Sequence, residues 1–128
     1  VGSEMCIRDR SNGGGVIINM GSTSWMIGQG GMPCYTTAKS AIQGLTRALA
    51  RDLGPKNIRV NCVVPGWIMT ERQVEMWLTP ESEKERMERQ CIKRKLVPED
   101  IAKFVLFMAS DEASACSNQS FIVDGGWL

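Results

Sequence analysis

In the first half of the chain, two continuous apolar runs flank a segment in which apolar and polar positions recur with a helical period. Residues 16–20 and 58–64 are short apolar runs without alternation, and the second is rich in β-branched residues. Such runs are typical of strands buried on both faces of a sheet. Between them, apolar residues recur at steps of three and four, which predicts a helix that Gly54-Pro55 ends. These residues are Ala38, Ile42, Leu45, Leu49 and Leu53.

The second half of the chain begins with helix-start signals. Thr70 is a predicted N-cap, with Gln73 three residues later completing a capping box. Thr79-Pro80 predicts a second helix start and leads into the charged run 81–90, which we interpret as a solvated helix face. A third helix is predicted from Pro98, and a third strand closes the chain in SFIVDGG. The apolar side of that third helix comprises Ile101, Phe104, Val105 and Met108.

The order strand, helix, strand, helices, strand predicts an α/β fold. Strands separated by helices form a parallel sheet covered on both faces. Three strands are few for such a sheet, so we expect residues 13–128 to be the C-terminal half of a Rossmann-like, doubly wound domain. Residues 1–12 do not continue into the pattern, and we interpret them as a leader or non-native segment.

Composition excludes several classes of function. A net charge of +1 leaves no electrostatic footprint for nucleic acid or an anionic membrane, and no apolar run is long enough to span a bilayer. The chain has no histidine, which excludes a Ser-His-Asp triad and histidine-ligated metal within it. Its five cysteines are scattered, which is typical of reduced thiols in a cytoplasmic protein and offers no zinc cluster.

The stretch CYTTAKS places Tyr35 four residues before Lys39, on nearly the same face of the predicted helix. A phenol, with an ordinary pKa near 10, is a poor base at neutral pH, and activating it requires roughly 4 kcal/mol. A lysine ammonium about 4 Å away contributes on the order of 4 kcal/mol at an effective dielectric near 20. The pair therefore fits a proton acceptor and its activator, although the same spacing occurs on solvated helix surfaces.

Two further polar features fall at the same predicted sheet edge. Ser22 lies just past the end of the first strand, and the Pro65-Gly66 turn follows the second. Ligands of open parallel sheets bind outside the carboxyl ends of the strands. We therefore expect Ser22, the Pro65-Gly66 turn and the Tyr35–Lys39 pair to border one site.

Four stretches in this order resemble the short-chain dehydrogenase/reductase family: NMGS (19–22), YTTAK (35–39), NCVVPGWIMT (61–70) and VDGG (123–126). The resemblance covers residues 13–128. It implies that Tyr35 is the catalytic base, that Lys39 assists it and binds the nicotinamide ribose, and that Ser22 holds the substrate oxygen.

The resemblance also implies cofactor contacts. Besides Tyr35 and Lys39, the segment after the second strand is expected to bind the cofactor. In that segment the residues that approach the nicotinamide carboxamide are Pro65, Gly66, Ile68 and Thr70. The cofactor is NAD or NADP, with NAD favoured. The family's glycine-rich phosphate loop, its catalytic asparagine and the residue that selects between the two dinucleotides have no counterpart here. We therefore expect the chain alone to bind no dinucleotide tightly and to be inactive.

Within the family, stretches such as CVVPGWIMTERQ and RQCIKRKLVPEDIA resemble bacterial aldose 1-dehydrogenases of the xylose type. The implied reaction oxidises the anomeric hydroxyl of a small sugar to a lactone. The alternatives are a 3-oxoacyl-carrier-protein reductase and an inactive remnant that acts only through subunit assembly. The resemblance further implies a homotetramer when complete and a substrate lid after Thr70. We interpret the tryptophans and methionines near the site first as packing residues, and those at 67–77 are the first candidates for substrate walls.

Overall fold

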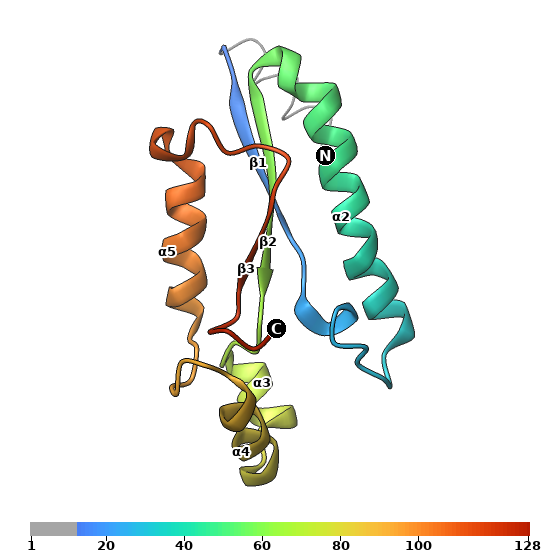
Figure 1. The fold of residues 1–128 in the computed structure, drawn as a ribbon, viewed down its shortest axis with the longest axis vertical. Coiled ribbons are helices and arrows are strands. Elements are labelled where there is room, and N and C mark those ends of the chain that lie inside the picture. Colours follow the sequence, from blue (N-terminus) through green and yellow to red (C-terminus); the bar gives the residue numbers. More distant parts are fainter. Residues whose placement is uncertain (1–12) are drawn as a thin grey trace.

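The computed structural model describes residues 13–128 (Figure 1). Its sheet consists of β1 (Gly15–Met20), β2 (Ile58–Pro65) and β3 (Ser120–Val123), in the order β1-β2-β3 and parallel throughout. The predicted parallel three-stranded sheet is therefore confirmed. The segment 1–12, interpreted as a leader or non-native, lies outside the described residues.

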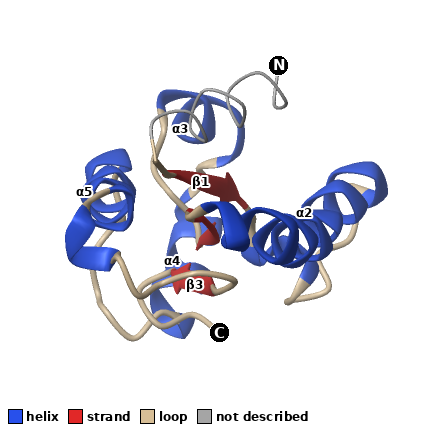
Figure 2. Ribbon diagram, turned by 90° about the horizontal axis from the view of Figure 1, so that it is seen from above, coloured by secondary structure: helices blue, strands red, loops and turns tan. Residues whose placement is uncertain are grey.

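Helices and 3₁₀ turns connect the strands. Between β1 and β2 lie η1 (Thr23–Trp25), α2 (Pro33–Leu53) and η2 (Gly54–Lys56); between β2 and β3 lie α3 (Glu71–Trp77), α4 (Pro80–Arg89), α5 (Pro98–Ala109) and η3 (Asp111–Ala113). Figure 2 shows α2 on one side of the sheet and α5 on the other. The helices α3 and α4 lie together beyond the end of β2 (Figure 1).

The core between α2 and the sheet forms where the end of the helix meets the beginning of β2. Ala50 and Leu53 of α2 pack with Ile58 and Val60 of β2, and all four side chains are buried. On the opposite face, Ile101 and Met108 of α5 are buried, as predicted from the sequence. Because β2 has neighbours on both edges and helices on both faces, it is the most buried strand, which explains its continuous apolar run.

The buried face of α2 differs from the predicted apolar stripe. Leu45, a member of the stripe, is 47% exposed, whereas Thr46 is buried. The Thr46 hydroxyl donates to the Ile42 carbonyl at 2.8 Å and accepts from Asn19 Nδ2 at 3.0 Å. A hydroxyl satisfied in this way can face a core at little cost, so polarity alone misjudged the orientation of the helix.

Just after the ends of β2 and β3, the backbone at Gly66 packs closely against Asp124. Gly66 N donates to Val123 O at 3.0 Å, and a Cβ atom added at Gly66 would lie 2.6 Å from Asp124 Cβ. The Asp124 carboxylate accepts from the backbone N–H groups of Gly126 and Leu128, at 2.8 and 2.9 Å. The VDGG stretch therefore has a structural role, because it folds the chain back against the strand ends.

We predict that Gly66→Ala destabilises the protein by about 1–3 kcal/mol, because overpacking forces the backbone or its neighbours to shift. Gly44→Ala is the matched control, because nothing lies within 4 Å of an added Cβ atom there. Within helix α2 the control should be neutral or stabilising by up to about 1 kcal/mol. Urea unfolding measures both changes, and equal stability of Gly66→Ala and wild type would refute the packing argument.

A pair of charged residues fixes the start of α5. Arg94 donates from both terminal nitrogens to the Asp100 carboxylate, at 2.7 and 2.8 Å, and Val97 N donates to it at 2.9 Å. The hydrogen bonds from Arg94 and from the Val97 backbone hold the pKa of Asp100 well below its usual range. Its ionised form is therefore stabilised in the folded state.

This depressed pKa predicts a specific dependence of stability on pH. The contribution of Asp100 is present above the unfolded-state pKa, near 3.8, and is lost as pH falls through the folded-state value. Asp100→Asn should therefore melt below wild type at pH 7, and the difference in Tm should shrink as the pH falls from 5 to 3. A difference that stays constant over this range would contradict the assignment.

Candidate active site

A cleft of about 600 Å³ opens at the carboxyl ends of the strands. It brings together five of the residues predicted from the sequence, namely Ser22, Tyr35, Gly66, Ile68 and Thr70. They come from the loop after β1, the first turn of α2 and the segment after β2. Lys39 and Pro65 do not line this cleft but adjoin residues that do.

Ser22 is held in place by its own turn. Gly21 N donates to Val63 O at 2.7 Å, and an added Cβ atom at Gly21 would lie 3.0 Å from Cys62 Sγ, so the chain leaves β1 tightly against β2. The Ser22 hydroxyl accepts from Ser24 N at 3.2 Å and donates to Ser24 Oγ at 3.0 Å. A hydroxyl has two acceptor positions, so Ser22 can still accept a hydrogen bond from a ligand.

Tyr35 and Lys39 occupy successive turns of α2. The Tyr35 side chain is 45% exposed and reaches the cleft. Lys39 Nζ lies 5.8 Å from the centre of the Tyr35 ring and donates to the Met20 carbonyl at 2.9 Å. That carbonyl, at the end of β1, ties the ammonium to the sheet and keeps it beside the ring.

The segment after β2 forms the opposite wall. Met69 N donates to Leu96 O at 2.8 Å, and a parallel bridge joins Ile68 to Leu96, so this loop is pinned to the approach to α5. Thr70 Oγ accepts from Gln73 N at 3.3 Å as the N-cap of α3. Since a hydroxyl can accept and donate at once, the Thr70 proton remains available to a ligand.

The predicted capping box at α3 is only half formed. The Gln73 side chain does not return to the Thr70 backbone; its Oε1 instead accepts from Trp67 Nε1 at 2.8 Å. Trp67 is only 8% exposed, and a buried indole N–H needs an acceptor. The Gln73 side chain therefore accepts the hydrogen bond from the Trp67 indole and does not bond to the backbone N–H of Thr70.

The sequence analysis missed the cationic and aromatic part of the cleft. Arg86 of α4 lies with Cζ 3.9 Å from the Trp67 ring centre and 4.9 Å from that of Trp127. Arg86 lines the cleft together with Arg72 and the two tryptophans. The run 81–90 is therefore not solely a solvated helix face. Of the predicted walls, Trp67 and Trp77 do line it. No sequence spacing links residues 67, 86 and 127, because three separate segments supply them.

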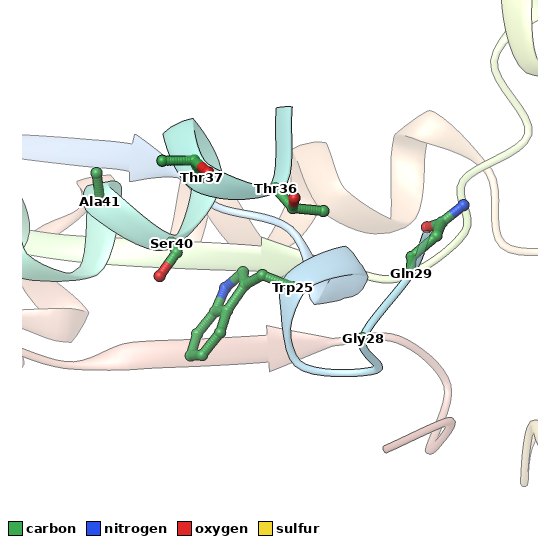
Figure 3. A pocket seen from close by; sticks show the side chains of 7 residues that line it. All are labelled: Trp25, Gly28, Gln29, Thr36, Thr37, Ser40 and Ala41. Atoms are coloured by element: carbon green, nitrogen blue, oxygen red, sulfur yellow. The ribbon is translucent and has the colours of Figure 1, made fainter. Parts of the chain in front are cut away.

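A second hollow, of about 620 Å³, lies beside the first turns of α2 (Figure 3). It is lined by Trp25, Gly28, Gln29, Thr36, Thr37, Ser40 and Ala41. None of the residues predicted for catalysis or cofactor binding borders it, and only Gln29 is shared with the cleft. Of these two hollows, only the cleft is therefore bordered by residues predicted for catalysis or cofactor binding.

Residues 13–128 contain no cluster of three histidine, cysteine or acidic side chains able to hold a metal ion. Over the same range, none of the helices has the length and apolar character needed to cross a bilayer.

Comparison with known proteins places these features in a family. A family model described as enoyl-(acyl carrier protein) reductase matches residues 3–128. D-xylose 1-dehydrogenase of Caulobacter vibrioides is 52% identical over 118 residues, covering 92% of this chain and 47% of that enzyme. A probable galactose dehydrogenase of Rhizobium meliloti is 50% identical over 114 residues, covering 89% of this chain and 44% of its own. The chain thus spans about half the length of the curated relatives it matches.

Solved structures agree in fold. A 7α-hydroxysteroid dehydrogenase complexed with NADH and 7-oxo glycochenodeoxycholic acid superposes with a TM-score of 0.89 at 39% identity, over 94% of this chain and 47% of that one. A short-chain dehydrogenase/reductase from Mycobacterium ulcerans gives a TM-score of 0.92 at 27% identity, over 98% and 46%. The chain belongs to the short-chain dehydrogenase/reductase family.

Proposed function

We propose that the complete protein is an NAD(P)-dependent oxidoreductase that removes hydride from C1 of an aldose while the C1 hydroxyl loses its proton. The observation that carries the proposal is that Ser22 and Tyr35 line one cleft, while Lys39 is anchored beside the Tyr35 ring. This arrangement supplies a substrate-binding hydroxyl, a proton acceptor and a cation without any histidine.

Each residue has a distinct task in this proposal. The Ser22 hydroxyl, which donates to Ser24 Oγ in this structure, turns to donate to the substrate oxygen and so leaves the substrate proton directed at Tyr35. Tyr35 then removes the hydroxyl proton as general base. Lys39 stabilises the negative charge that develops on the phenol oxygen, and its bond to Met20 O limits the reorganisation needed.

The wall after β2 fits a nicotinamide. The Thr70 hydroxyl has a proton to donate, and the Pro65–Gly66 and Ile68 backbone beside it is held rigid by the contacts to Val123 and Leu96. A carboxamide needs such a mixture of donors and acceptors. Lys39 and Tyr35 would meet the ribose from the opposite side. The bound dinucleotide supplies the hydride acceptor, and all proton movements belong to the protein.

NAD is the favoured dinucleotide and an aldose the favoured substrate. Two similar structures, the hydroxysteroid dehydrogenase and a 4-hydroxyisoleucine dehydrogenase, are described as complexes with NADH. The two relatives with 50% identity or more reported above are named for oxidising xylose and galactose. Sugars suit a cleft that combines indole surfaces with hydroxyl and guanidinium donors.

A 3-oxoacyl-carrier-protein reductase is the second candidate. Such an enzyme from Chlamydia trachomatis is 40% identical over 112 residues, covering 88% of this chain and 44% of its own. The lower identity makes this assignment weaker, and the net charge of +1 offers little attraction for an acidic carrier.

Assembly into a homotetramer completes the proposal. On α5 and β3, Leu106 is 73% exposed, Phe107 42% and Ile122 47%. We infer that these exposed apolar side chains pack against further copies of the protein, as the family resemblance implies. Assembly alone is the function that would remain if the complete protein proved to have no activity.

The assignment is tested with the complete protein by following NADH formation across a panel of aldoses and, in the reverse direction, NAD(P)H consumption with 3-oxoacyl thioesters. Oxidation of one or more aldoses supports the proposal. Activity confined to the thioesters would favour the second candidate, and no activity with either would leave the assembly role.

Tyr35→Phe removes only the phenol oxygen. We predict that turnover falls by at least 10²-fold, in line with the loss of a general base, while NADH binding measured by fluorescence changes little. Ser40→Ala is the control, because it removes a hydroxyl from the same helix but outside the cleft, and its turnover should match wild type. Undiminished turnover of Tyr35→Phe would show that another group takes the proton.

A further inference from the structure

Arg86 is the one residue of α4 that lines the active-site cleft. Its guanidinium lies over two indole rings, with Cζ 3.9 Å from the centre of Trp67 and 4.9 Å from that of Trp127. Cation–π contact of this kind attracts an arginine and restricts its orientation. Trp67 is itself fixed by its hydrogen bond to Gln73 Oε1. The guanidinium is therefore preorganised by the protein.

The guanidinium is nonetheless without a polar partner among residues 13–128. The three ion pairs found there join Arg89 to Glu85, Arg94 to Asp100 and Lys95 to Glu83. No hydrogen bond from the Arg86 side chain to another described residue is formed either. Burial lowers the pKa of Arg86, which reflects the cost of removing the cation from water, and the charge of Glu85, which pairs with Arg89, offsets only part of this shift. A preorganised, partly desolvated donor is suited to a ligand.

The rest of the cleft identifies the kind of ligand. Its lining contains no aspartate or glutamate, and it combines indole rings with hydroxyl and amide groups. Arg86 shares this cleft with Ser22 and Tyr35, so a molecule oxidised by Tyr35 is within the same cavity as the guanidinium. In a cyclic aldose, the hydroxyls that do not react are hydrogen-bond acceptors on several neighbouring ring carbons, and arginine offers five N–H donors.

We propose that Arg86 is a specificity-determining residue that donates hydrogen bonds to the non-reacting hydroxyls of a neutral aldose, with Trp67 and Trp127 holding the guanidinium in place. The inference rests on the proposed function and assigns the substrate's second point of attachment, opposite Ser22 and Tyr35. It distinguishes sugars from alcohols that carry only the reacting hydroxyl.

The test uses the complete protein, the aldose it oxidises best and the monodeoxy analogues of that sugar. For wild type, one deoxy analogue should lose about 10–100-fold in kcat/KM, as expected for a hydrogen bond to a charged group. Arg86→Met should lose a similar factor with the parent sugar, through KM more than kcat, and should then tolerate the same analogue with little further loss. Arg86→Lys, which keeps charge but not the planar fork, should be intermediate.

Arg89→Met is the matched control, since Arg89 lies on the same helix, is exposed and does not line the cleft; its kinetics should match wild type. Tryptophan fluorescence titration with the aldonolactone product provides a readout independent of turnover, and Arg86→Met should weaken that binding. Far-UV circular dichroism establishes that each variant folds, and if Arg86→Met does not fold, Arg86→Lys carries the cycle.

Three results would overturn the inference while leaving the proposed function intact. If Arg86→Met lowered kcat/KM by the same factor for the parent sugar and for every deoxy analogue, relative to wild type, the residue would have a purely structural role. Unchanged kinetics of that variant would remove it from recognition. Preference for a uronate over the parent aldose would assign the guanidinium to a carboxylate. If wild type oxidises simple alcohols but no aldose, the proposed substrate class fails, and this inference fails with it.

Discussion

Parallel pairing of β2 with strands on both sides is the constraint on which the rest of the structure depends. β2 is buried almost throughout and pairs in register with β1 and β3. Because parallel strands run in the same direction, their carboxyl ends meet at one edge, and the turns that follow them share that edge. For this reason Ser22 and Gly66 line one cleft and Gly66 packs against Asp124, although the three residues are far apart in sequence. Loss of this register would separate the two walls of the cleft.

In the proposed function, the two walls of the cleft have different roles. We assign the proton transfer to the wall from α2 and the end of β1, where Tyr35 lines the cleft and Lys39 donates to Met20 O. We assign recognition to the other wall, from the segment after β2 and from α4, which presents aromatic surfaces and a cation. The packing of Asp124 against Gly66 joins the chain end to this second wall and brings Trp127 next to Arg86. A structural turn thereby contributes to the proposed specificity.

Much of the fold could be predicted from the sequence because local signals were strong. The strands and the helix from Pro98 to Ala109 were predicted closely, since uninterrupted β-branched runs and proline at a helix start are local features. The orientation of α2 could not be predicted from polarity, because the partner that satisfies Thr46 is Asn19 on a distant strand. The Gln73 side chain does not cap α3 because it accepts a hydrogen bond from the buried indole of Trp67, and that burial depends on the tertiary structure. Five of the residues carried over from the family line one cleft, whereas the cluster of Arg86, Trp67 and Trp127 depends on three segments that only the tertiary structure brings together.

We propose that a sugar binds in this cleft between Tyr35 and the wall that carries Trp67 and Arg86. A crystal structure of the complete protein with NAD and the aldonolactone product would show whether it does. We expect the C1 oxygen within hydrogen-bond distance of the Tyr35 phenol and the Ser22 hydroxyl, with the remaining hydroxyls toward Arg86. A sugar bound elsewhere, or one whose C1 faces away from Tyr35, would contradict it.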